Sequence, residues 1–133
     1  MVKFFLKHRV KIFLLSCLPC QLIPWFQAGS ESAPQLGFWP MLPFTEVAII
    51  LYCFDQRKDC KRRQLLLGSL AHIIIVVGMI AFFLFSPILA NIKGEIDTQL
   101  SLKGVREGFW IELILVIVDW FLMCTSYYSA GKK

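Results

Sequence analysis

Four long apolar stretches, residues 12–28, 38–54, 65–92 and 109–128, constrain the fold of this chain more than any other feature. About 20 helical residues cross a hydrocarbon core of roughly 30 Å, and the last two stretches have that length, whereas the first two are shorter and contain prolines. Hydrophobic residues make up 57% of the chain and charged residues 17%, which excludes an ordinary cytosolic enzyme, a disordered protein and a secreted disulfide scaffold. We therefore expect an all-α polytopic membrane protein, a single domain over residues 1–133 with four transmembrane helices.

Basic residues are distributed unevenly around these four stretches. The connections on one side hold only Lys93, Lys103 and Arg106. The other side holds eleven basic residues, including a cluster between the second and third stretches: Lys3, Lys7, Arg9, Lys11, Arg57, Lys58, Lys61, Arg62, Arg63, Lys132 and Lys133. By the positive-inside rule, this bias predicts that both termini and the basic loop at residues 55–64 are cytoplasmic. The net charge of +5 then reflects orientation and contact with anionic lipid headgroups, and we expect no binding to nucleic acid.

The N-terminus has an alternative interpretation, because positive charge followed by an apolar run is also typical of a secretory signal, and residues 14–17 resemble a lipobox. The apolar run between Lys11 and Cys17 is only about five residues long, which is short for a signal core. The residues before a cut at Ala28 are the large side chains of Trp25, Phe26 and Gln27, which a signal peptidase disfavours. We expect a retained first helix.

Prolines and aromatic residues refine this topology. Pro19 and Pro24 each remove a backbone donor and predict kinks in the first span, and Pro87 is expected to bend or end the third span after residue 85. Pro40 and Pro43 occupy the first turns of the second span, where a missing N–H is tolerated. A short interfacial helix is also plausible within residues 94–108.

Tryptophan and tyrosine residues mark the ends of the predicted spans. The topology assigns Trp25, Trp39 and Trp110 to the outer interface and Tyr127 and Tyr128 to the inner one. Aromatic side chains with a polar group favour both membrane–water interfaces. These positions support four spans.

Five cysteines raise the question of thiol chemistry, because Cys17 and Cys20 form a CxxC pair that could exchange electrons with a quinone. That mechanism needs the pair at the oxidising face, whereas the predicted topology places all five on the reducing side: Cys17, Cys20, Cys53, Cys60 and Cys124. A thiol oxidoreductase is therefore consistent only with the inverted orientation, and buried apolar thiols are the favoured interpretation. The spacings match no zinc site, phosphate-binding glycine loop or hydrolase triad, so we expect no metal, no cofactor and no enzyme activity.

Ionisable residues inside the spans are the most informative feature. Glu46, His72 and Asp119 come from three different spans and lie about 10–13 Å from the inner face at 1.5 Å per residue. Such residues turn inward, pair or become neutral, so Glu46 and Asp119 are predicted to face one another across the interior. The three residues form an intramembrane polar patch that handles protons or cations, captures a partner helix, or joins the helices; the last two are favoured. Glu112 lies near the end of its span, so it is expected to reach water.

Four short motifs, at residues 54–59, 67–71, 85–87 and 109–113, resemble those of the YbjM family of enterobacterial inner-membrane proteins in order and approximate spacing. The resemblance extends over roughly residues 34–123. It implies a small four-span protein of the bacterial inner membrane and brings no activity with it.

Small size, short connections and the lack of a catalytic motif favour a non-enzymatic accessory, regulatory or protective protein. We expect it to contact membrane lipids and either another membrane protein or further copies of itself. The alternative is a small proton-coupled transporter that uses the intramembrane carboxylates Glu46 and Asp119.

The basic bias predicts the outcome of topology reporters. Alkaline phosphatase fused after Gly94 should be active, because the enzyme requires export, and a fusion after Arg63 should be inactive. The reverse pattern, measured in intact cells, would invert the orientation and revive the thiol hypothesis.

Overall fold

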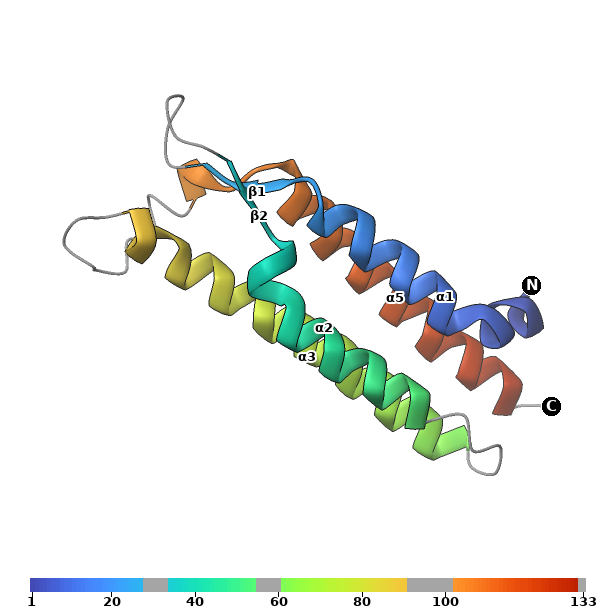
Figure 1. Cartoon of the computed structure of the whole chain (residues 1–133). Helices are drawn as coiled ribbons and strands as arrows, with labels where there is room; N and C mark the ends of the chain where they lie inside the picture. The colour runs from blue at the N-terminus through green and yellow to red at the C-terminus, as the bar shows by residue number, and fades with distance from the viewer. Residues whose placement is uncertain (28–33, 55–60, 91–101, 132–133) are drawn as a thin grey trace.

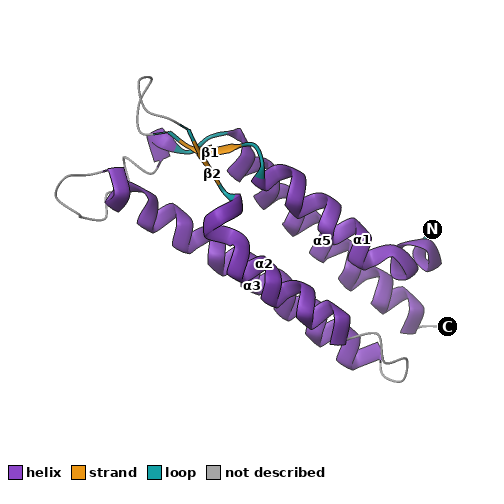
Figure 2. Cartoon of the chain, in the orientation of Figure 1, coloured by secondary structure: helices purple, strands orange, loops and turns teal. Residues whose placement is uncertain are grey.

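A computed structural model describes residues 1–27, 34–54, 61–90 and 102–131, and most of these are helical. The helices are α1 (Val2–Gln21), α2 (Phe38–Phe54), α3 (Lys61–Ala90) and α5 (Glu107–Gly131). Two short strands, β1 (Pro24–Phe26) and β2 (Gln35–Leu36), form a small antiparallel sheet (Figure 2). The predicted all-α class is confirmed.

Two helix pairs make up the bundle. In Figure 1, α1 runs beside α5 and α2 runs beside α3, and the two strands lie together at one end. Both chain termini lie at the opposite end, where α2 ends and α3 begins. The basic residues near the N-terminus are thus at the same end of the bundle as Arg62 and Arg63, which are exposed in the first turn of α3. Of the rest of the predicted basic loop, Arg57 and Lys58 lie outside the described residues.

Two helices are long and apolar enough to cross a membrane, within Arg62–Phe85 of α3 and Glu107–Ser129 of α5. Only 39% and 33% of their apolar windows are buried inside the bundle, whereas the core helix of a soluble protein is mostly buried. Their outward faces carry large apolar side chains, among them Leu66, Ile73, Val77, Ile80, Ile114, Ile117, Val118 and Phe121. Polar side chains instead lie in the interior, as described below. This apolar exterior around a polar interior is the distribution expected in lipid.

The first predicted span is wrong in its boundaries. Residues 12–28 were expected to form one helix, but α1 begins at Val2 and ends at Gln21, and residues 24–26 are a strand. Pro24 explains the end of the helix, because proline disfavours helical geometry in the residue before it. Pro19 is accommodated within the last turn. The second apolar helix, within Phe38–Tyr52, is also shorter than α3 and α5, so four crossings rest on the sequence prediction.

The strands form part of a cap on the bundle. β1 pairs with β2 and also meets the segment before α5, where Gln27 N donates to Gly104 O at 2.8 Å and Arg106 N donates to Trp25 O at 2.7 Å. The Trp25 indole is fully buried, donates to Cys20 O at 2.8 Å and packs edge-on against two phenylalanine rings, Phe82 and Phe109.

Trp25 is therefore a core residue, and its predicted place in the outer aromatic belt is wrong. The other two tryptophans of the predicted belt, Trp39 and Trp110, are exposed. Tyr127 is buried and Tyr128 is exposed at the opposite end.

In the third span, Pro87 does not end the helix near residue 85, because α3 continues to Ala90, close to the end of the predicted stretch at residue 92. A proline removes a single intrahelical hydrogen bond, and its position close to the helix end limits the disruption. Most of the predicted interfacial helix lies outside the described residues, and residues 102–104 form one helical turn.

Two buried glycines are expected to differ in their tolerance of an added methyl group. A Cβ on Gly108 would lie 2.9 Å from the backbone oxygens of Ile23 and Pro24, which cannot move without breaking the cap. A Cβ on Gly68 would meet the flexible Met123 sulfur at 2.5 Å, which can rotate away. We expect Gly108→Ala to destabilise the protein by about 1–3 kcal/mol and Gly68→Ala to be nearly neutral, since alanine favours helix. Thermal unfolding in mild detergent, followed by circular dichroism, measures both, and equal melting temperatures would contradict the rigid cap.

Candidate functional site

The inward face of α5 carries the polar residues of the bundle interior. Glu112, Val116, Asp119 and Met123 recur at helical spacing and are all buried. The two carboxyl groups are therefore stacked two turns apart, about 10 Å along the helix axis. The thiol of Cys17 on α1 lies within electrostatic range of both.

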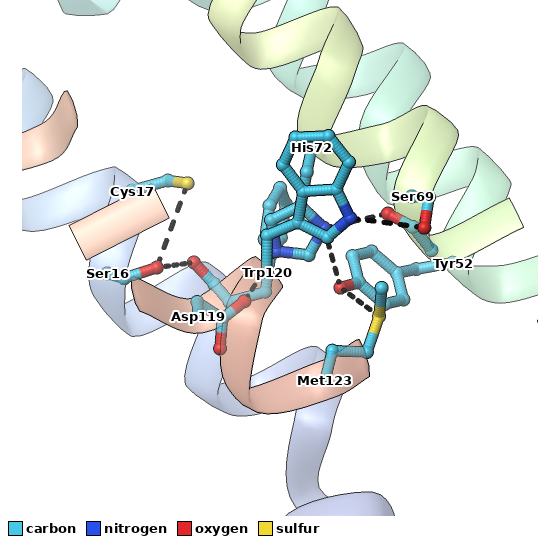
Figure 3. A network of polar contacts seen from close by, with 10 residues as sticks. Ser16, Cys17, Tyr52, Ser69, His72, Asp119, Trp120 and Met123 are labelled. Carbon is cyan, nitrogen blue, oxygen red and sulfur yellow. Dashed lines mark hydrogen bonds and ion pairs between the residues drawn. The ribbon is translucent and has the colours of Figure 1, made fainter. Parts of the chain in front are cut away.

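His72 and Asp119 form the central contact of a first polar layer, the one nearer the chain termini. His72 on α3 is fully buried, and its Nε2 lies 2.7 Å from Asp119 Oδ2 on α5 (Figure 3). Its Nδ1 lies 2.7 Å from the carbonyl oxygen of Gly68, one turn earlier on the same helix. Of the three residues in the predicted patch, the structure brings His72 and Asp119 into contact.

The hydrogen bonds of His72 define how many protons the His72–Asp119 pair carries. A carbonyl oxygen only accepts, so Nδ1 must carry a proton that it donates to Gly68. One further proton then lies between Nε2 and the Asp119 carboxyl, on either side of the 2.7 Å contact. The pair is either an imidazolium with a carboxylate or an imidazole with a carboxylic acid. Both forms have zero net charge, which lowers the free energy of placing the pair in an apolar interior.

Aromatic rings enclose the His72 imidazole. Phe13 of α1 meets it edge-on at 5.1 Å, and Trp120 of α5 is stacked at 6.4 Å with an interplanar angle of 15°. The Trp120 indole is held by a hydrogen bond to Ser69 Oγ of 3.1 Å (Figure 3). Tyr52 of α2 places its hydroxyl 3.3 Å from His72 Nδ1 and donates to Met123 Sδ. All four helices therefore contribute to this layer.

A buried arginine lies toward the end of the bundle that holds the termini. The Arg9 guanidinium carbon lies 5.9 Å from the centre of the Tyr52 ring and 5.7 Å from that of Tyr127. The Tyr127 hydroxyl donates to Gln64 Oε1 at 3.3 Å. Cation–π contacts of this kind contribute roughly 0.5–2 kcal/mol, depending on desolvation.

Glu46 is not part of the polar interior, contrary to the prediction that it faces Asp119. Its side chain is exposed, whereas its neighbour Thr45 points inward and is buried. Phe44 packs at Gly78 and Tyr52 at Gly68, so α2 and α3 are antiparallel and Glu46 lies near the level of residue 76. That level is within about one turn of the middle of Arg62–Phe85.

A second polar layer was missed by the sequence analysis. Gln21 Nε2 donates to Thr45 Oγ1 at 3.0 Å and to Glu112 Oε1 at 3.1 Å, and the three residues are 1%, 3% and 0% exposed. The expectation that Glu112 reaches water is therefore wrong. Its signal was present, because Glu112 precedes Asp119 by seven residues and so shares its helix face.

The cysteine pair is buried without a disulfide. Cys17 and Cys20 are free thiols, and Cys124 is free and half-buried. Within the described ranges, no group of three or more His, Cys, Asp or Glu side chains is arranged to hold a metal ion.

No family model, curated protein or solved structure matches this chain in sequence or structure comparisons. The function must therefore be argued from the two polar layers and from the exposed carboxyl of Glu46.

The shared proton predicts how Asp119 variants behave. Asp119→Asn should fold with a stability within about 1 kcal/mol of the wild type, because the amide can donate to Nε2 of a neutral His72. Asp119→Ala leaves Nε2 buried without its partner and should lose about 1–3 kcal/mol. Thr125→Ala, at an exposed position on the same helix, is the control. Thermal unfolding in detergent measures all three, and an Asn variant as unstable as the Ala variant would exclude the shared-proton arrangement.

Proposed function

We propose that this chain is a small, non-enzymatic accessory protein of the bacterial inner membrane that contacts another membrane protein within the bilayer. The observation that carries the proposal is the exposed Glu46 carboxyl on an otherwise apolar helix face. The polar interior supports it less directly, because its hydrogen bonds join the four helices and resemble structural contacts.

The outward stripe of α2 consists of Trp39, Pro43, Glu46 and Ile50, which recur every three or four residues and are all exposed. Glu46 lies in the middle of this stripe. A charged side chain at the centre of a transmembrane helix costs about 2.5–3.5 kcal/mol on insertion scales. A partner helix that donates a hydrogen bond at the same depth would offset that cost, whereas lipid tails would not.

The complementary chemistry of the partner follows from this carboxyl. A transmembrane helix with a Lys, Arg, Asn or Ser side chain at mid-depth fits the stripe, and its neighbours should be apolar to match Trp39 and Ile50. Membrane lipids cover the remaining apolar faces. The eleven-to-three basic bias supports a cytoplasmic location for both termini. The resemblance to the YbjM family is consistent with the same membrane and stays a prediction.

The transporter alternative is weakened in the form that relies on two facing carboxylates. Glu46 is exposed and Asp119 is buried against His72, so the two cannot share one proton-carrying site. Proton coupling would have to use the buried groups alone.

Site-specific photo-crosslinking in native membranes tests the partner contact. A photoreactive residue at Ile50, on the stripe, should give one discrete adduct with a different membrane protein. The same residue at Ile117, exposed on α5, should give mainly lipid adducts. Glu46→Gln should preserve the Ile50 adduct because an amide still forms hydrogen bonds, and Glu46→Leu should reduce it at least about fivefold, equivalent to about 1 kcal/mol.

Three outcomes would count against the proposal. An Ile50 adduct of twice the chain's own mass would indicate self-association in place of a separate partner. Equal adducts from Ile50 and Ile117 would show that the stripe is not special. An adduct unaffected by Glu46→Leu would remove the carboxyl from the contact.

A further inference from the structure

The second polar layer, formed by Gln21, Thr45 and Glu112, supports an inference that is independent of the partner contact. Gln21, Thr45 and Glu112 belong to three helices, α1, α2 and α5, and meet in the interior. Two of the oxygens, Thr45 Oγ1 and Glu112 Oε1, lie 3.0 and 3.1 Å from a single nitrogen, Gln21 Nε2. One amide group of α1 is therefore hydrogen-bonded to a hydroxyl of α2 and to a carboxyl of α5.

Two further oxygens of this layer lack hydrogen bonds. Gln21 Oε1 and Glu112 Oε2 are buried and have no hydrogen-bond partner among the described residues. A buried carboxyl with an unsatisfied oxygen is destabilising by about 1–3 kcal/mol or more. Unsatisfied groups of this kind in a native interior call for a further partner, such as a water molecule or an ion.

The charge around Glu112 favours a positive ligand. Within the described residues, the ion pairs join His72 to Asp119 and Arg106 to Glu107, so neither basic group neutralises Glu112. α1 ends at Gln21, and its last turn has no basic residue. This end of the helix carries the negative end of the helix dipole. The other titratable groups near Glu112 are the thiols of Cys17 and Cys20 on α1, and neither is a cation. Thr45 is the polar contribution of α2.

We propose that Gln21, Thr45 and Glu112 form a binding site for one small monovalent cation of the Na⁺ type. Carboxylate, amide and hydroxyl oxygens are the ligands that hard cations prefer. One carboxylate neutralises one positive charge, whereas a divalent ion would leave an uncompensated charge in an apolar interior. The two oxygens without hydrogen bonds, Gln21 Oε1 and Glu112 Oε2, are free to bind a cation, because Gln21 Nε2 already donates to Thr45 Oγ1 and Glu112 Oε1.

The site lies close to the capped end of the bundle. Glu112 is five residues into α5, about 7.5 Å from the start of the helix. Trp25 packs on Phe109 and against Gly108, directly above the site. The cap therefore separates the oxygen cluster from that end of the bundle.

Binding of ²²Na⁺ to the purified full-length protein in detergent at pH 8 tests the site. We expect saturable binding of one ion per chain, displaced by unlabelled Na⁺ and unaffected by choline. Glu112→Gln should abolish it. Glu107→Gln, which changes an exposed glutamate at the start of the same helix, should leave it unchanged. Thr45→Val, which removes one ligand oxygen and no charge, should weaken affinity by about tenfold or more.

Several results would overturn the site. These are no saturable ²²Na⁺ binding to the wild type, or equal binding to the wild type and the Glu112→Gln variant. A melting temperature that changes with pH but not with Na⁺ would indicate a protonated carboxyl in place of a cation. If the Glu112→Gln variant does not accumulate, a Na⁺ affinity of Thr45→Val equal to that of the wild type would also overturn the site. None of these results bears on the Ile50 crosslink, so the two proposals fail separately.

Discussion

The contact between His72 and Asp119 is the interaction on which the rest of the bundle depends. It joins α3 to α5, the two helices that are long and apolar enough to cross a membrane. In a low-dielectric interior an unpaired charge is strongly disfavoured, so each of these residues requires the other. Phe13 and Tyr52 then bring α1 and α2 against the same imidazole ring. All four helices therefore meet at one buried pair.

The sequence predicted the parts of this arrangement that depend on one helix at a time. Apolar length located α2, α3 and α5 to within a few residues, and the largest difference is the extra turn with which α3 begins, at Lys61. Depth along the helix brought His72 and Asp119 together correctly, because both distances were counted from the same face. The prediction failed for α1, where the charged residues Lys3 to Lys11 were read as a flank although they belong to the helix, and where Pro24 ends it early.

Rotation about the helix axis was the main source of error for the site. Depth alone placed Glu46 beside Asp119, but Thr45 takes the inward position on α2 and turns Glu46 outward. The low amphipathicity of α2, which is apolar on nearly every side, left its inward face undefined by the sequence. For Glu112 the error had the opposite sign. Its position near the end of the helix predicted exposure to water, but the cap built from β1 and residues 104–106 covers that end and the side chain is buried. Such a cap depends on contacts between segments about 80 residues apart, which no local pattern encodes.

The cap also has a consequence for the order of assembly. β1 forms hydrogen bonds with β2, which follows within ten residues, and with residues 104–106, which are synthesised only after α2 and α3. If α1 enters the bilayer, its short apolar half and the strand that follows it leave backbone groups that lipid cannot satisfy. The ribosome must therefore deliver nearly the whole chain before these groups are paired, and the first helix made is among the last to reach its final environment.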